Sequence, residues 1–191
     1  MNKLICILLI VSAFISCNGG KTKSDSLKES VEKFKDTLGT LEIEEYIPKE
    51  YAEVTTDTLL SNGFSISIKT YTDMNRSVKF QYKVDATLTQ IDNFRDWISE
   101  VKIKKDDVLI FNKKLDANFF LEQDKTIKDS LHKAINNKVW VNEDLLEKNY
   151  VYLVGGFIFP KSENVLYYDI KIDDKGNYSI KKMKNINYAR T

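Results

Sequence analysis

Glycine, proline, histidine and cysteine are scarce in this 191-residue chain, which contains seven, two, one and two of them respectively. The low glycine and proline content excludes a collagen-like or proline-rich low-complexity protein. A surplus of one charge is also missing, because 29 lysine and arginine residues balance 28 aspartate and glutamate residues. Nucleic-acid-binding proteins normally carry a clear positive surplus, so we expect no nucleic-acid partner. Aromatic residues, at 12% of the chain, are plentiful and exclude a chain that is disordered throughout.

The first sixteen residues are predicted to be a signal peptide. Lys3 supplies a positive start, and residues 4–15 form an almost unbroken apolar run. About a dozen apolar residues are too few for a permanent membrane-spanning helix, which needs ~20. A positive start followed by a short apolar run is typical of a secretory signal peptide.

The residues that follow the apolar run, Phe14-Ile15-Ser16-Cys17, resemble a bacterial lipobox, in which a small residue precedes a cysteine that receives lipid. The resemblance implies cleavage after Ser16, thioether lipidation of Cys17 and acylation of the new amino terminus. Two or more acyl chains hold a protein stably at a bilayer, so we expect Cys17 to anchor a soluble domain to a membrane. Since Cys6 leaves with the signal peptide, disulfides, cysteine nucleophiles and thiolate metal sites are excluded.

Between this anchor and the main domain, the sequence predicts a tether and a helix. Residues 17–24 are the lipidated cysteine and a small, polar, flexible tether. Residues 25–47 are predicted to form a helix and a linker, and Ser26 and Glu29 have the spacing of a capping box. The apolar stripe of this helix consists of Leu27, Val31, Phe34 and Leu38. A helix docked on its own domain is the simplest interpretation, and a dimerising or partner-binding helix is the alternative.

Residues 48–191 are predicted to form a single, mainly β domain, because apolar and polar residues alternate along most of this region. Asn62-Gly63 is a strong hairpin signal, and Gly155-Gly156 suggests a β-bulge. A helical pattern interrupts the strands at residues 124–137, and Asp124 is positioned to cap it. Strands are expected at residues 54–60, 64–71, 78–88, 101–104, 108–111, 150–159, 165–172 and 178–183.

These elements predict a mainly β fold of the α+β class. About seven or eight strands in hairpin order are expected to form an antiparallel meander, arranged as a sandwich or an open barrel. An N-terminal helix and one inserted helix complete the predicted fold.

The sequence contains no recognisable catalytic constellation. His132 has Asp129 and Ser130 on its own predicted helix, and neighbours on one helix do not converge on a substrate as a catalytic triad does. One histidine and no mature cysteine exclude the usual zinc and copper sites, so neither a metal nor another cofactor is expected. The carboxylate pairs Asp106-Asp107 and Asp173-Asp174 are expected to form turns. A hydrolase that uses a carboxylate pair is kept as an alternative function.

Two surface features are candidates for binding. Most of the aromatic residues are expected in the core, but Trp140 and Tyr167 are predicted to form a ligand-binding surface, because exposed aromatic rings stack on sugars or anchor protein partners. Five lysines could form a basic patch, although a solvated strand face is the simpler interpretation. These lysines are Lys79, Lys83, Lys102, Lys104 and Lys105.

Three parts of the chain resemble small lipoproteins of Bacteroidota that have no characterised function. They are the lipobox, residues 150–173, and residues 94–120, in which a hairpin precedes Asn118-Phe119-Phe120. The resemblance implies the envelope of a Gram-negative anaerobe and no transferable activity. Surface-exported lipoproteins of this group often have an acidic run after the cysteine. Because this tether has none directly after Cys17, the resemblance favours the periplasmic face of the outer membrane over the cell surface.

The sequence therefore predicts a lipid-anchored domain of the cell envelope that is not an enzyme and binds a protein or a glycan. The acyl anchor at Cys17 is expected to attach this domain to the membrane. The alternatives are the envelope hydrolase described above and a structural stalk or dimerisation module built on the N-terminal helix.

Overall fold

The computed structural model describes residues 22–37 and 41–183. The predicted signal peptide, Cys17 and most of the tether lie outside the described residues. The chain divides into two compact units, Met1–Glu42 with Val84–Thr89, and Ile43–Lys83 with Gln90–Thr191.

Helix α2, which spans Lys23–Thr37, confirms the helix predicted after the tether. Its N-terminus differs from the prediction, because the capping pair is Thr22 and Asp25 instead of Ser26 and Glu29. The Asp25 backbone N–H donates to Thr22 Oγ1 at 3.1 Å, and the Thr22 hydroxyl donates to Asp25 Oδ2 at 2.6 Å. Of the apolar stripe, Leu27, Val31 and Phe34 are exposed, while Leu38 lies outside the described residues.

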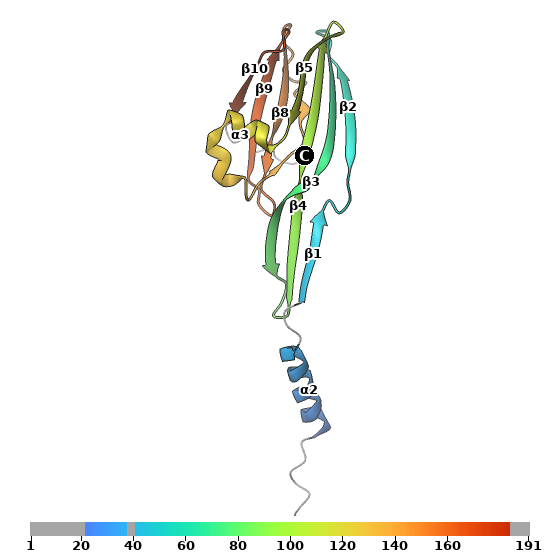
Figure 1. Cartoon of the computed structure of the whole chain (residues 1–191), viewed down its shortest axis with the longest axis vertical. Helices are drawn as coiled ribbons and strands as arrows, with labels where there is room; N and C mark the ends of the chain where they lie inside the picture. The colour runs from blue at the N-terminus through green and yellow to red at the C-terminus, as the bar shows by residue number, and fades with distance from the viewer. Residues whose placement is uncertain (1–21, 38–40, 184–191) are drawn as a thin grey trace, which may run out of the picture. The chain divides into compact units, whose positions relative to one another are not determined.

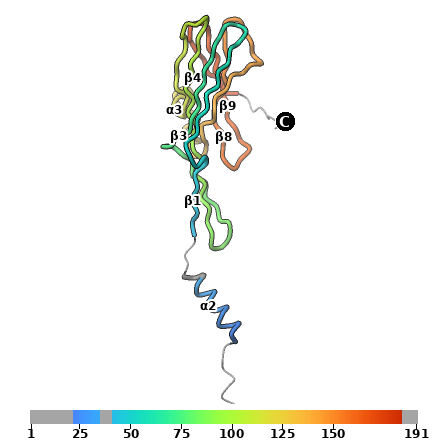
Figure 2. Tube along the Cα trace, turned by 90° about the vertical axis from the view of Figure 1, so that its right-hand side faces the viewer, coloured from blue at the N-terminus to red at the C-terminus, as the bar shows by residue number. Residues whose placement is uncertain are grey.

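The fold is a mainly β, α+β sandwich of two sheets without a closed barrel, which confirms the predicted fold class (Figure 1). The first sheet has the order β1-β4-β3-β2, and β5 also pairs with β4. The second has the order β10-β9-β8-β6, and β7 also pairs with β8. Figure 2 shows β3 and β4 in one layer and β8 and β9 in the other.

The strands of the first sheet are β1 (Leu41–Ile47), β2 (Glu53–Leu59), β3 (Phe64–Lys83), β4 (Leu88–Lys105) and β5 (Val108–Leu115). The strands of the second sheet are β6 (Ile135–Asn136), β7 (Trp140–Val141), β8 (Tyr150–Ile158), β9 (Val165–Asp173) and β10 (Tyr178–Lys182). Strand β1 occupies part of the predicted linker.

The core lies between the inward faces of the two sheets. Alternate residues of β3 face inward, and Phe64, Ile66 and Ile68 are buried as the alternation predicts. From the second sheet, Val151 and Leu153 are fully buried. An aromatic cluster joins the sheets to α3, and its members are Phe111, Phe119, Phe120, Phe157, Tyr168 and Tyr178.

The predicted helix at residues 124–137 is largely wrong. The structure has an earlier α-helix, α3 (Ala117–Gln123), and a short 3-10 helix, η1 (Lys125–Ser130). Asp116 caps α3 by accepting from the Phe119 N–H at 3.0 Å, and Asp124 caps η1, as predicted for the start of this segment. Ile135 and Asn136 pair with β8 instead of extending the helix. Sequence periodicity could not reveal that pairing, because the paired residues of β8 lie 21 and 23 residues further along the chain.

The half-buried strand predicted at residues 78–88 is also corrected. Strand β3 continues from Phe64 to Lys83, and a turn follows where the prediction continued the strand. Val78 is buried, but Phe80 and Tyr82 are 39% and 38% exposed. Strand β3 has 20 residues while β8 and β9 have 9 each, so the second sheet is too short to cover the far end of β3.

At Gly155-Gly156, where a bulge was predicted, β8 pairs with β9 in an unbroken register from Tyr150–Asp173 to Ile158–Val165. On the other edge of β8 the register shifts by one residue between Asn136–Phe157 and Trp140–Val154, so the extra residue lies opposite the glycines, between β6 and β7, instead of in β8. The hairpin at Asn62-Gly63 is confirmed. It joins β2 to β3, with a φ of 85° at Gly63.

Candidate functional site

The outward face of the second sheet brings together the two residues that the sequence singled out. The rings of Trp140 and Tyr167 have centroids 5.3 Å apart and an interplanar angle of 84°, which is an edge-to-face contact. Trp140 is 37% exposed and Tyr167 is half-buried. We call Trp140, Tyr167, Asn137 and Asp169 the aromatic surface.

The strand register explains how the two rings meet. Trp140 of β7 lies opposite Val154 of β8, and Tyr167 of β9 lies opposite Gly156 of β8. Because β7 and β9 flank β8, the Trp140 ring must reach across β8 to contact Tyr167. Gly156 lies between the two rings on this face and has no side chain that would block their contact. The glycine is also required by the backbone, since its φ is +151° and a Cβ atom there would lie 2.1 Å from the Leu166 carbonyl oxygen.

Polar groups flank the aromatic pair. The Asn137 side-chain amide donates to the Tyr167 hydroxyl at 3.3 Å. Asp169, two residues after Tyr167 on the same face of β9, has a buried Oδ1 atom that accepts no hydrogen bond from any described residue. Burial raises the pKa of the Asp169 carboxyl, and the positive charge of Lys181 opposes this shift only in part. The aromatic surface therefore combines an exposed ring with a carboxylate whose hydrogen-bonding capacity is incompletely used.

The other end of the same sheet face has its polar groups already paired. Lys171 Nζ lies 3.7 Å from the centroid of the Tyr150 ring and 3.4 Å from Glu147 Oε2. The Tyr152 hydroxyl donates to Glu147 Oε1, and this hydrogen bond is the main reason that the pKa of Glu147 is lowered. The polar groups of this cluster bond to one another, so the cluster is a weaker candidate for a ligand-binding site than the aromatic surface.

The sequence matches no protein-family model and no curated protein.

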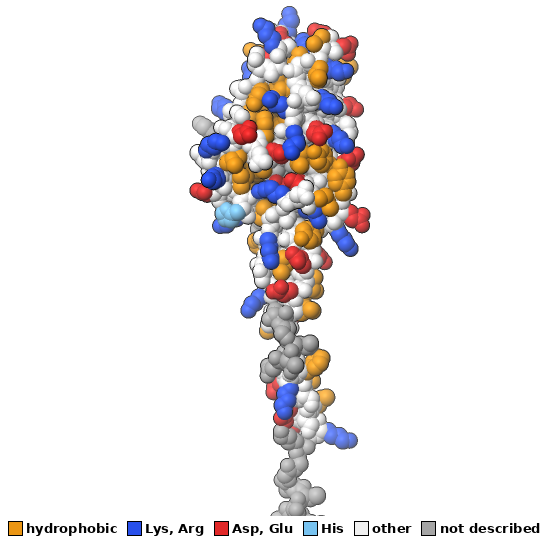
Figure 3. All heavy atoms as spheres, viewed as in Figure 1, with side chains coloured by type: hydrophobic (Ala, Val, Ile, Leu, Met, Phe, Trp, Pro, Cys, Tyr) orange, Lys and Arg blue, Asp and Glu red, His pale blue; other side chains and the backbone are white. Residues whose placement is uncertain are grey.

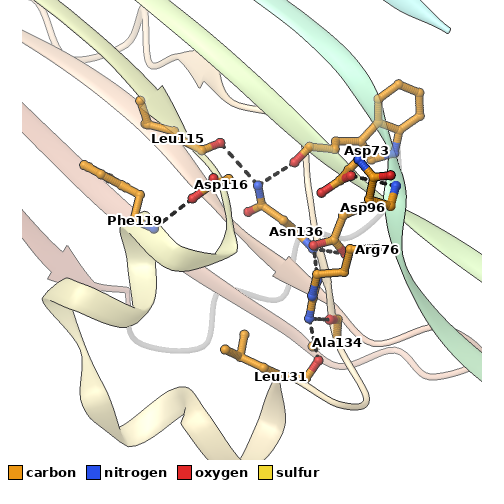
Figure 4. A network of polar contacts seen from close by, with 11 residues as sticks. Asp73, Arg76, Asp96, Leu115, Asp116, Phe119, Leu131, Ala134 and Asn136 are labelled. Carbon is orange, nitrogen blue, oxygen red and sulfur yellow. Dashed lines mark hydrogen bonds and ion pairs between the residues drawn. The ribbon is translucent and has the colours of Figure 1, made fainter. Parts of the chain in front are cut away.

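A buried polar network joins the first sheet to the segment after η1 (Figure 4). Arg76 of β3 forms an ion pair with Asp96 of β4 and donates to the carbonyl oxygens of Leu131 at 2.7 Å and Ala134 at 3.4 Å. The Asn136 backbone N–H donates to Asp96 Oδ1 at 3.1 Å. The Asp96 side chain is only 3% exposed, so these contacts hold the segment in place and leave little access for a ligand.

Asn136 extends this network to the next residue of β4 and to the end of β5. Its side-chain amide donates to the carbonyl oxygens of Trp97 at 2.6 Å and Leu115 at 3.3 Å. Sequence reasoning missed the network because charged and amide residues in strands are usually exposed, and nothing in their spacing indicates burial.

The carboxylate pairs occupy turns, as predicted. Asp106 and Asp107 have φ angles of 48° and 66° in the turn between β4 and β5. Asp173 accepts hydrogen bonds from the backbone N–H groups of Lys175 and Asn177 at 2.9 and 2.8 Å. Turn conformation and local hydrogen bonding thus account for both pairs.

His132 lies exposed in the turn after η1 (Figure 3). Within residues 22–37 and 41–183, no group of three or more histidine, cysteine, aspartate or glutamate side chains is placed to hold a metal ion. None of the helices in that part of the chain has the length and apolar character needed to cross a membrane.

Proposed function

We propose that this protein is a lipid-anchored domain of the cell envelope that binds a glycan through the aromatic surface and catalyses no reaction. The edge-to-face pair of Trp140 and Tyr167 beside Asp169 carries this proposal. A protein partner is the alternative ligand.

The aromatic surface suits a sugar better than a protein. Carbohydrate recognition needs an exposed ring for the apolar face of the sugar and polar groups for its hydroxyls, and Trp140, Asn137 and Asp169 supply both. A stable protein interface buries about 800 Å² on each partner around a desolvated apolar centre. The sheet face beside Trp140 instead presents two charged residues, Asp169 and Lys181, which lie opposite each other on the neighbouring strands β9 and β10.

The proposed anchor would make weak binding sufficient. A domain attached through acyl chains at Cys17 stays near the membrane, which raises its effective concentration for envelope ligands. We place the protein at the outer membrane, with its domain on the periplasmic side, on the basis of the sequence resemblance. Mass spectrometry of protein from its native host tests the anchor. An acylated Cys17 at the mature N-terminus is expected, and an unmodified sulfur or an intact leader would remove this part of the proposal.

Glycan binding is tested with the full chain on an array of bacterial cell-wall and capsular glycans. Trp140→Ala should weaken retention at least tenfold. The matched control is Phe80→Ala, which removes another aromatic side chain of similar exposure from the first sheet and should leave retention unchanged. If no glycan is retained, but crosslinking in cells captures a protein that the Trp140→Ala variant fails to capture, the ligand is a protein instead.

One observation favours a second candidate, the dimerisation module. Leu27, Val31 and Phe34 form an exposed apolar stripe on α2, and such a stripe can pair with another helix. Sedimentation measurements on the full chain would show a dimer that the double variant Leu27→Ser/Phe34→Ser converts to a monomer. A native chain that already sediments as a monomer would reject this candidate.

A further inference from the structure

The outward face of the first sheet contains a partly open hollow that the proposed function does not use. Its volume is about 540 Å³, which falls within the range of small-ligand sites. The lining residues come from four neighbouring strands, β2 to β5. They are Asp57, Ser65, Ser67, Lys102, Lys104, Leu109 and Asn112.

The hollow follows from the sizes of the side chains along this face. Ser65 and Ser67 occupy alternate positions of β3 and form a low floor of hydroxyl groups. Asp57 of β2 lies opposite Ser67 and forms one wall. On the other side, β4 contributes Lys102 and Lys104 as the second wall. Short side chains between longer ones thus leave a space above the centre of the sheet.

Strand β5 completes the second wall. Asn112 lies opposite Lys102, and Leu109 lies opposite Lys104. The hollow therefore offers ammonium, hydroxyl, amide and carboxylate groups beside a single apolar side chain.

The charges in the hollow are separated. Lys102 and Lys104 form no ion pair with any described residue, and neither does Asp57. Because β3 lies between β2 and β4, the strands that carry the carboxylate and the lysines are about 10 Å apart. One side of the hollow is thus positive, while the other side accepts hydrogen bonds.

We propose that this hollow binds an anionic saccharide, a sugar that carries a phosphate or a carboxylate group. The anionic group lies against Lys102 and Lys104, where two ammonium groups replace its water ligands. The sugar hydroxyls reach Ser65, Ser67 and Asp57. The inference does not depend on the aromatic surface, because the two sites use different sheets and share no residue.

The test is calorimetric titration of the full chain in detergent with four probes at low salt. Glucose 6-phosphate and glucuronate should bind. Neutral glucose and inorganic phosphate should bind at least tenfold more weakly, because each lacks one half of the recognised ligand. Chemical-shift changes at the Asn112 side-chain amide should locate the bound sugar in the hollow.

A pair of charge-matched variants completes the test. Lys102→Gln/Lys104→Gln should weaken glucose 6-phosphate binding at least tenfold, and Lys79→Gln/Lys83→Gln, which removes the same charge from exposed positions of β3, should have no effect. The loss caused by Lys102→Gln/Lys104→Gln should be the same in chains with and without Trp140→Ala, so failure here is distinguishable from failure of the aromatic surface. Equal effects of the two double variants, equal binding of inorganic phosphate, or no binding of either charged sugar would overturn the proposal.

Discussion

The ion pair between Arg76 and Asp96 gives the sharpest stability prediction. Arg76→Met removes the only cation that pairs with Asp96 among the described residues, together with two hydrogen bonds to backbone carbonyl oxygens. Asp96 would then keep a single hydrogen bond, from the Asn136 N–H, on a side chain that is 3% exposed. Breaking a buried ion pair costs about 3–5 kcal/mol. The Arg76 side chain is 30% exposed, so water can enter the vacated space. We therefore expect the free energy of unfolding to fall by about 3 kcal/mol, at the lower end of this range.

Removing both charges should cost less than the sum of the single changes. Asp96→Leu alone leaves Arg76 with its carbonyl partners and partial access to water, for an expected loss of about 2 kcal/mol. The double variant Arg76→Met/Asp96→Leu leaves no buried charge, and we again expect a loss of about 2 kcal/mol. The singles would then sum to about 5 kcal/mol, so the coupling energy of the pair is about 3 kcal/mol.

The assay is equilibrium unfolding of the full chain in urea, followed by tryptophan fluorescence. Lys69→Met is the matched control, since it breaks an exposed ion pair with Glu53 of 3.1 Å and should leave the midpoint nearly unchanged. Additive losses, with a coupling energy below about 0.5 kcal/mol, would contradict the conclusion that the Asp96 charge is buried and depends on Arg76.

Three further changes test other parts of the structure. Gly156→Ala should destabilise the fold by more than about 2 kcal/mol, because the new Cβ atom would lie 2.1 Å from the Leu166 carbonyl oxygen. Gly63→Ala should cost less in the same urea assay, because the Cβ atom there would meet only the ends of flexible side chains. Phe120→Ala should cost about 3–5 kcal/mol, since the ring is fully buried, and a loss below about 1 kcal/mol would contradict its central place in the core. Asp169→Asn should raise the melting temperature at pH 7. The raised pKa of Asp169 means that its ionised form weakens the fold once the pH rises through that pKa, so the gain should shrink toward pH 4, and a lower melting temperature at pH 7 would contradict the reasoning.

Much of the fold could be predicted from local pattern. Alternation identified the inward positions of β3, and Asn62-Gly63 identified its hairpin with β2, because both signals depend on residues close together in the chain. Alternation also assigned Tyr167 and Tyr168 to opposite faces of one strand, and the structure places Tyr168 in the core and Tyr167 on the outward face.

Tertiary structure alone decided how these strands were paired and covered. The exposure of Phe80 depends on the length of a sheet formed some seventy residues later, which its own alternating pattern does not contain. The meeting of Trp140 with Tyr167 depends on both of their strands flanking β8, and the burial of Asp96 depends on Arg76 and on the segment after η1. A side-chain pattern specifies which residues share a face, whereas the partner of that face is set by contacts between segments that are distant along the chain.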